Sequence, residues 1–175
     1  MSRRRQVFLG CSLLLVFILQ LAVIPQFKIL GVQPDLILVL AVVVAVQDGP
    51  VEGAIIGFIG GMMLDLASHQ VVGVGAFSKA LAALFAGLLK DFFMTYSILL
   101  PVLLVFLASI FELSLHQLAL MMLGQEQLPP FKLVGLVLPA ALFNVLTVFV
   151  VYTILKRFRF PLKEESMIVT RIGGS

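Results

Sequence analysis

Residues Gly53–Leu66, GAIIGFIGGMMLDL, form an apolar segment with four glycines and one aspartate. Each glycine inside a helix costs about 1 kcal/mol relative to alanine, so a soluble core helix rarely carries four of them. In a bilayer, helices associate through close backbone contact over small residues. The segment is therefore predicted to be a membrane-spanning helix whose glycines form a packing face.

The composition of the whole chain also indicates a membrane protein. Of its 175 residues, 61% are hydrophobic and 12% are charged, whereas soluble domains are roughly 45–50% apolar and about 25% charged. The mean hydropathy is +1.17. The single cysteine, Cys11, excludes an internal disulfide. Because the basic residues lie beside apolar runs and not in an aromatic-interleaved patch, no nucleic-acid partner is expected.

Apolar runs predict an all-α integral membrane protein with six transmembrane helices. The expected spans are Gln6–Ile24, Leu36–Val46, Val51–Ala67, Gly75–Leu89, Ser97–Met122 and Leu133–Leu155. The second helix is expected to begin at Pro34, which suits the first helical position, with Asp35 near the positive end of the dipole. It covers only about 21 Å. It must therefore be shielded by its neighbours or extended by Phe27–Gln33, and a shallow hollow is expected beside its outer end.

Charge placement predicts the topology. The basic start and first apolar run lack a small-x-small cleavage site, which favours an uncleaved signal anchor over a signal peptide. Six spans put both termini on one side, together with most of the basic residues: Arg3, Arg4, Arg5, Lys90, Lys156, Arg157, Arg159, Lys163 and Arg171. The positive-inside rule makes that side cytoplasmic. We expect a membrane domain over 1–163 and a cytoplasmic tail over 164–175.

The cluster 156–163 has two interpretations. It is either a plain topology signal or a contact site for the anionic head groups of membrane lipids.

Two sets of small residues are predicted to pack together. Gly53, Gly57 and Gly61 fall four residues apart in the third span, and Gly60 widens their face. The opposing surface is expected on the fourth span, which carries Ala76, Ala80, Ala83 and Gly87. A helix backbone approaching a ligand is the alternative interpretation of the glycines.

Five polar or charged residues fall within the predicted spans: Asp65, Lys79, Glu112, His116 and Asn144. Such groups are costly in a membrane unless they are paired or wetted. The antiparallel return after the third span predicts that Asp65 lies near Lys79, so the two are expected to form an ion pair. The alternative is that Asp65 reaches interfacial water.

The polar residues of the last two spans follow helical spacing. Ser109, Glu112 and His116 share one face of the fifth span, and Asn144 and Thr147 share a face of the sixth. They are either interhelical hydrogen-bond partners or, for Glu112 and His116, a proton relay or half of a metal site.

Enzyme motifs are absent from the sequence. It has no Walker loop, no GxSxG and no HExxH, since its two histidines lie far apart. No catalytic residue, cofactor or metal is expected.

The segment Gln33–Leu89 resembles the rod shape-determining membrane protein family MreD. The matching features are the Pro-Asp-Leu start of the second span, a glycine-proline turn, and a glycine-rich third span that ends in Leu-Asp-Leu. The family pattern matches Pro34, Asp35, Gly57, Gly61 and Asp65. The turn ASHQVVGVG departs from it, because serine, glycine and proline are more usual there.

This resemblance implies a non-enzymatic protein of the bacterial inner membrane that supports cell shape and peptidoglycan synthesis. The implied partner is MreC, a bitopic protein, within an elongasome that also holds MreB, RodA and a class B penicillin-binding transpeptidase. The implied fold is similar to the S-components of energy-coupling-factor transporters.

Two functions remain open from the sequence. A scaffold would bind MreC through an apolar face near the second span, or along the last two spans with Phe106, Phe111, Phe143 and Phe149. An S-component-like transporter subunit would instead hold a small molecule among the five intramembrane polar residues. An ion channel has little support, because no span carries a polar stripe along its whole length.

Overall fold

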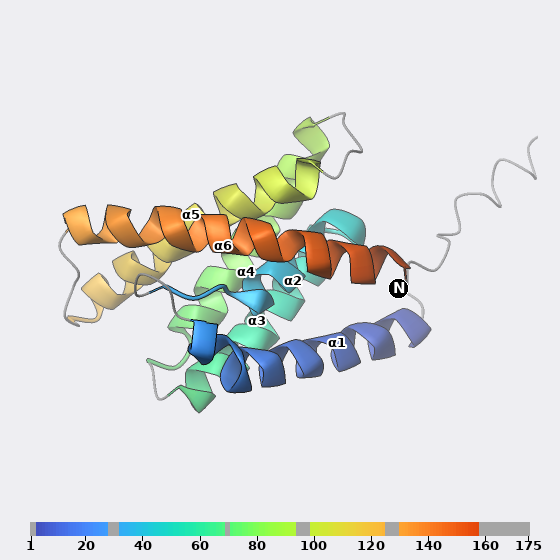
Figure 1. Cartoon of the computed structure of the whole chain (residues 1–175), viewed down its shortest axis with the longest axis horizontal. Helices are drawn as coiled ribbons and strands as arrows, with labels where there is room; N and C mark the ends of the chain where they lie inside the picture. The colour runs from blue at the N-terminus through green and yellow to red at the C-terminus, as the bar shows by residue number, and fades with distance from the viewer. Residues whose placement is uncertain (1–2, 28–31, 69–70, 94–98, 125–129, 158–175) are drawn as a thin grey trace, which may run out of the picture.

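The computed structural model describes residues 3–27, 32–68, 71–93, 99–124 and 130–157, and the regular elements within these ranges are all helical (Figure 1). The α-helices are α1 (Arg3–Ala22), α2 (Leu36–Gln47), α3 (Pro50–Ala67), α4 (Val74–Leu89), α5 (Leu99–Met122) and α6 (Pro130–Arg157). Two short 3₁₀ helices, η1 (Ile24–Phe27) and η2 (Lys90–Phe92), follow α1 and α4. The predicted tail 164–175 and the basic cluster beyond Arg157 lie outside the described residues.

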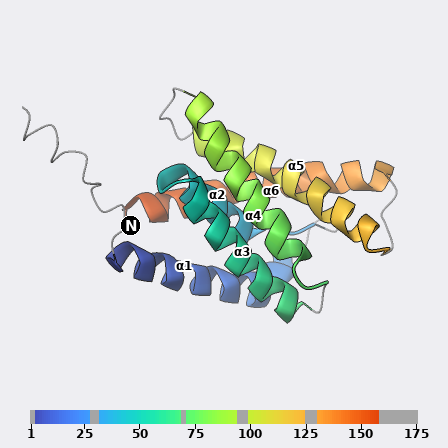
Figure 2. The same ribbon diagram turned by 180° about the vertical axis from the view of Figure 1, so that it is seen from behind.

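The helices run back and forth between two ends of the molecule (Figures 1 and 2). The first residues of α1 and the last residues of α6 lie at the same end. The last residues of α1, α3 and α5 lie toward the opposite end, as do the first residues of α4 and α6. The six observed helices coincide with the six predicted apolar segments to within three residues at either end.

Four helical segments are long and apolar enough to cross a membrane: Arg3–Gln26, Pro50–Ala67, Leu99–Met122 and Gly135–Ile154. The other two, α2 with 12 residues and α4 with 16, are shorter. At about 1.5 Å per residue they fall below the roughly 30 Å of a hydrocarbon core. The prediction of six helices is therefore confirmed, and four of the described helical segments have the length and composition of a membrane span.

Helix α2 is the centre of the bundle. The nine consecutive residues Ile37–Ala45 are each at most 1% exposed. A helix that is apolar all round is expected to be buried, and all five other α-helices pack against this one. The expectation that neighbours shield this short helix is confirmed, and its length need not match the bilayer because little of it meets lipid.

The glycines of α3 face two neighbours. A Cβ atom on Gly57 would lie 2.8 Å from the carbonyl oxygen of Lys79, and one on Gly61 would lie 2.6 Å from the Cα of Ala76. Both glycines therefore lie against the backbone of α4, next to Ala80 in the case of Gly57.

The other two glycines of this set do not face α4, as was expected for the whole set. A Cβ on Gly60 would lie 2.5 Å from a methyl group of Ile37, and Gly53 lies directly against Ala45, so both approach α2. At about 100° per residue, positions seven apart nearly coincide on a helix, so these two glycines form one edge of the face. On α4, Gly87 packs against Pro50, and Ala83 is fully buried.

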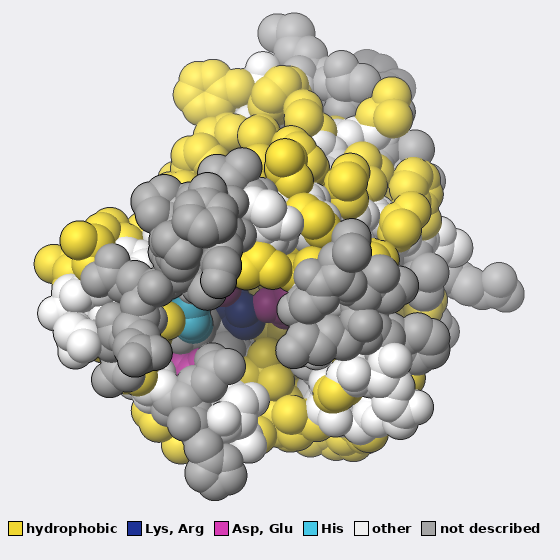
Figure 3. Space-filling model, turned by 60° about the vertical axis from the view of Figure 1, so that its left-hand side comes forward, with side chains coloured by type: hydrophobic (Ala, Val, Ile, Leu, Met, Phe, Trp, Pro, Cys, Tyr) yellow, Lys and Arg dark blue, Asp and Glu magenta, His cyan; other side chains and the backbone are white. Residues whose placement is uncertain are grey.

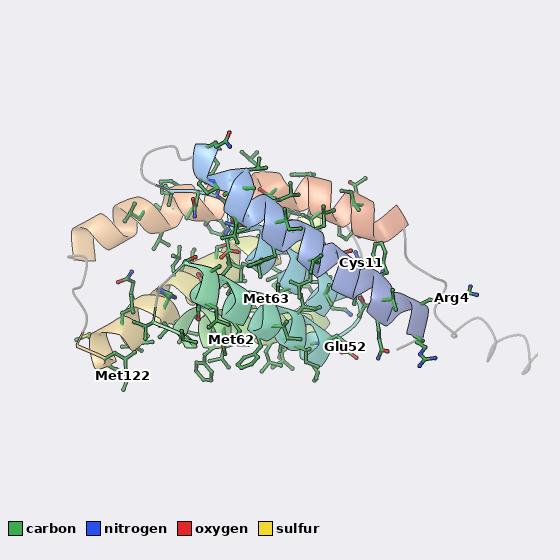
Figure 4. All side chains as sticks on the ribbon, turned by 90° about the horizontal axis from the view of Figure 1, so that it is seen from below. Arg4, Cys11, Glu52, Met62, Met63 and Met122 are labelled. Atoms are coloured by element: carbon green, nitrogen blue, oxygen red, sulfur yellow. The ribbon has the colours of Figure 1, made fainter. Side chains whose placement is uncertain are left out.

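A buried ion pair at the terminal end was not anticipated from the sequence. The Arg5 side chain, 6% exposed, donates from Nη2 to Asp48 Oδ2 at 2.7 Å and to Gln47 Oε1 at 3.3 Å. The neighbouring Arg4 points away from the bundle, and Glu52 lies in the first turn of α3 at the same end (Figure 4). Arg5 thus links the start of α1 to the α2–α3 turn.

Candidate functional site

The polar residues of the described spans converge at the end of the bundle opposite the termini. Lys79, in the second turn of α4, lies 2.5 Å from Asp35 Oδ2 and 2.9 Å from Glu112 Oε1 through its Nζ. The three side chains are 9%, 22% and 6% exposed, respectively. Ser78 Oγ also donates to Glu112 Oε1, at 3.2 Å. This buried triad joins the start of α2 to α4 and α5.

Asp35 has a second role as the N-cap of α2. Its Oδ1 accepts from the backbone N–H of Leu38 at 2.9 Å. Asparagine and aspartate oxygens suit this position because the first N–H groups of a helix have no partner within it. The helix therefore begins at Leu36, and the expectation that Pro34 occupies its first position is wrong by two residues.

Asn144 links α6 to the same cluster. Its Oδ1 accepts from the backbone N–H of Asp35 at 2.6 Å, and its Nδ2 donates to Ser109 Oγ at 2.9 Å. Ser109 in turn donates to the carbonyl of Val105. Thr147, predicted on the same face as Asn144, donates to Phe143 within its own helix instead.

Gln20 has a role that the sequence did not predict. Its Nε2 donates to the carbonyl of Pro34 at 3.1 Å, and its Oε1 accepts from the N–H of Leu36 at 2.8 Å. One amide thereby satisfies two backbone groups where the chain enters α2. The available signal was a glutamine at the end of an otherwise apolar run, and this signal does not indicate a partner.

The expected ion pair between Asp65 and Lys79 is wrong. Asp65 Oδ2 accepts from the backbone N–H groups of Gly73 and Ala76, at 2.9 and 3.2 Å, and so caps the start of α4. The residue is only 2% exposed, so the alternative of interfacial water does not hold either. The short connection brings the end of α3 to the first turn of α4, where unpaired N–H groups and the positive dipole end favour a carboxylate.

The cap predicts a graded response at Asp65. Replacement by alanine leaves N–H groups at the start of α4 without an acceptor, so we expect a loss of about 1–2 kcal/mol of stability. Asp65→Asn keeps one acceptor oxygen and should lose less. Reversible unfolding in mixed micelles measures both variants. Equal losses for alanine and asparagine would contradict the capping role.

An open cavity of about 400 Å³ lies over these residues. Lys79, Glu112, Asp65 and Asn144 line it and are buried, whereas Leu21, Pro25, Gln33 and Ser68 line it and are exposed. The first group therefore forms the floor and the second group the rim. Figure 3 looks into this end, where basic, acidic and histidine side chains are visible deep in the hollow.

His116 also lines the cavity, and its Nδ1 is buried without a hydrogen-bond partner in the described part of the chain. Glu112 is held by Lys79 and Ser78 and not by His116. Within the described residues, no group of three or more His, Cys, Asp or Glu side chains is arranged to hold a metal ion. The cluster therefore offers carboxylates, one ammonium and one unsatisfied imidazole nitrogen for binding a polar group.

Comparison with known protein families gives one match: the model described as rod shape-determining protein MreD covers residues 1–159. The chain belongs to the MreD family. No curated protein and no solved structure matches it. Membership implies a role in rod shape determination, and the apolar helices suggest a multi-pass membrane protein. MreD proteins are shape-determining membrane proteins and not a known enzyme family.

Three of the five residues that match the MreD pattern lie together at the cavity. Pro34 and Asp35, just before α2, and Asp65, near the end of α3, line it, whereas Gly57 and Gly61 pack against α4. Pro34 contributes its carbonyl to Gln20, while the two aspartates cap α2 and α4. In this MreD chain the two acidic positions therefore fix the starts of two helices that pack against α3.

Proposed function

We propose that this chain is a non-enzymatic scaffold of the bacterial cell-elongation complex that binds MreC and so supports cell shape and peptidoglycan synthesis. The observation that carries the proposal is the family match over residues 1–159. RodA, the class B penicillin-binding transpeptidase and MreB are linked to it through the same complex. A large share of the surface is apolar, which suits a protein whose partners meet it within the membrane.

In this proposal all six helices cross the inner membrane, with both termini in the cytoplasm. The two short helices are carried by the four longer ones, because α2 is enclosed and α4 packs against α3 and α5. Residues 1–163 then form the membrane domain and 164–175 the cytoplasmic tail. The cavity faces the outer side, and the similarity to S-component folds belongs to this proposal.

We place the MreC contact in an apolar groove between α1 and α6, with α2 as its floor. The groove has a volume of about 440 Å³ and is lined by residues that include Ser12, Leu15, Leu40, Phe143 and Ile154. From Phe143 to Ile154 it follows three turns of α6, about 16 Å. Its apolar lining and lateral position suit a single transmembrane helix, which a bitopic partner would supply.

The four phenylalanines named from the sequence do not form one face. Phe143 lines the groove, whereas Phe111 stacks on Phe85 of α4 with ring centroids 4.8 Å apart. Phe149 is 46% exposed and Phe106 is partly buried. This distribution favours the α1–α6 groove over a face along α5.

A pair of neighbouring substitutions tests the contact. Ser12→Phe fills the groove and should reduce recovery of MreC with the affinity-tagged chain by about tenfold, the equivalent of 1.4 kcal/mol. Cys11→Phe adds a similar bulk one position away, at an exposed residue that does not line the groove. It should retain wild-type recovery. Equal recovery for Ser12→Phe and Cys11→Phe would contradict the proposed docking face.

The second candidate function is the S-component-like small-molecule transporter subunit. The observation that favours it is the polar cavity, because a scaffold that works through an apolar face needs no such feature. A transporter subunit would in addition bind an energising ATPase module in place of MreC.

A further inference from the structure

We propose that the cavity is a binding site for a small amphipathic amine, whose ammonium group is held by Asp35, Glu112 and His116. The inference concerns the polar floor of the cavity, which the docking of a partner helix on the α1–α6 groove does not use. The two surfaces are separate except for Pro34, which lines both.

The sign of the ligand charge follows from the charges that line the cavity. Among the described residues that line the cavity, Asp35, Asp65 and Glu112 oppose Lys79, which leaves a formal charge of −2 when His116 is neutral. The two backbone N–H groups and the dipole of α4 stabilise Asp65. Of the other two carboxylates, a single lysine can neutralise only one. An anionic ligand would meet this excess negative charge, whereas a cation would offset it.

The unpaired hydrogen-bonding groups of the floor favour a ligand that donates hydrogen bonds. Glu112 Oε1 accepts from Lys79 and Ser78, while its Oε2 takes no hydrogen bond from the described residues. In its Nε2–H tautomer, His116 presents the buried, unpartnered Nδ1 as a second acceptor. Lys79 retains one N–H beyond its bonds to Asp35 and Glu112. A primary ammonium, with three N–H donors, matches the two acceptors.

The size and lining of the cavity indicate the size and apolar character of the rest of the ligand. A volume of about 400 Å³ lies in the range of small-molecule sites, roughly 300–1,000 Å³. The buried floor is polar, and the exposed rim includes Leu21 and Pro25. An amine with a short apolar body would place its charge on the floor and its body against the rim. Either a free amine or the amine of a lipid head group has this chemistry.

The experiment uses the full-length chain in nanodiscs of phosphatidylglycerol, with hexylammonium as the probe. A ligand that binds only the folded state raises the melting temperature in a saturable way. Hexylammonium should do so, whereas hexanol and hexanoate, which have the same apolar body, should not. A saturable effect of hexanol or hexanoate equal to that of hexylammonium, or no saturable effect of hexylammonium, would overturn the proposal.

Three variants locate the site. Glu112→Gln and His116→Phe should each weaken hexylammonium affinity by about tenfold or more, because the first removes a negative charge from the floor and the second removes an acceptor. Glu52→Gln removes a carboxylate at the opposite end and should leave the affinity unchanged. Unchanged affinity in both floor variants would overturn the assignment. If Glu112→Gln does not fold, His116→Phe and the three probes still decide the question.

Repeating the titration in nanodiscs that contain phosphatidylethanolamine identifies the source of the amine. A weaker apparent affinity of hexylammonium there supports a lipid head group as the occupant, and an unchanged affinity supports a free amine. Neither result depends on MreC. The amine site can therefore be disproved without affecting the proposed scaffold function, and the reverse also holds.

Discussion

Replacing Lys79 by methionine is expected to destabilise the protein by about 3–5 kcal/mol, the usual cost of removing one partner from a buried ion pair. The methionine fills a similar volume but leaves Asp35 and Glu112 facing each other without a cation. Their side chains are only 22% and 6% exposed, so water cannot compensate fully. Reversible unfolding in mixed micelles gives the change in free energy.

The matched control removes the whole charge cluster. Adding Asp35→Asn and Glu112→Gln to Lys79→Met leaves no uncompensated charge, and replacement of a complete buried ion cluster is often close to neutral. The triple variant should therefore be more stable than Lys79→Met alone. Wild-type stability of the single variant, or a further loss in the triple variant, would contradict a tightly coupled triad.

Replacing Gly57 by leucine is expected to separate α3 from α4 and abolish recovery of folded protein. Even an alanine Cβ at this position would lie 2.8 Å from the Lys79 carbonyl oxygen and 3.2 Å from the Ala80 nitrogen. Both are backbone atoms, so relief requires movement of a whole helix. Overpacking typically costs about 1–3 kcal/mol, which we expect for Gly57→Ala, and leucine adds more volume at the same point.

Gly10 on α1 provides the control. A Cβ there would meet nothing within 4 Å, and the residue is exposed. Gly10→Ala should be neutral or stabilising, because alanine favours a helix over glycine by about 1 kcal/mol. The sign of the alanine effect should therefore differ between the two positions, and unfolding measurements on both variants decide it. A neutral Gly57→Ala would show that α3 and α4 do not depend on close contact there.

The helices could be predicted from the sequence because each one contains an apolar run bounded by turn or polar residues. The turn Gln47–Pro50 and the glycines near position 73 mark helix ends, and they can be recognised without any information about tertiary structure. The burial of α2 was also predictable, since a helix too short for the bilayer has to be covered by others.

The partners of the polar residues were harder to predict because they come from distant helices. Lys79 and Asp65 lie close in sequence, which suggested an ion pair. Asp65 instead accepts hydrogen bonds from N–H groups at the start of α4, which lie nearer to it along the chain. The partners that Lys79 has, Asp35 and Glu112, depend on how α2 and α5 flank α4. The periodicity of the sequence does not predict how these helices pack, and the same applies to the ion pair between Arg5 and Asp48.

The polar cluster adds a structural role to the proposed scaffold function. Asp35, Lys79, Glu112 and Asn144 join α2, α4, α5 and α6 near one end, while Arg5 joins α1 to α2 near the other. The central helix is thus fixed at both ends, and it also forms the floor of the groove proposed for MreC. A rigid floor favours binding of a partner helix, because little conformational entropy is lost when the helix binds.

Purification of the chain from its native membrane in mild detergent tests directly whether it binds MreC. Mass spectrometry should then identify both the proteins and the small molecules that remain bound. We expect MreC in stoichiometric amount. An energising ATPase module with a retained solute, and no MreC, would contradict the scaffold function and support the transporter subunit instead.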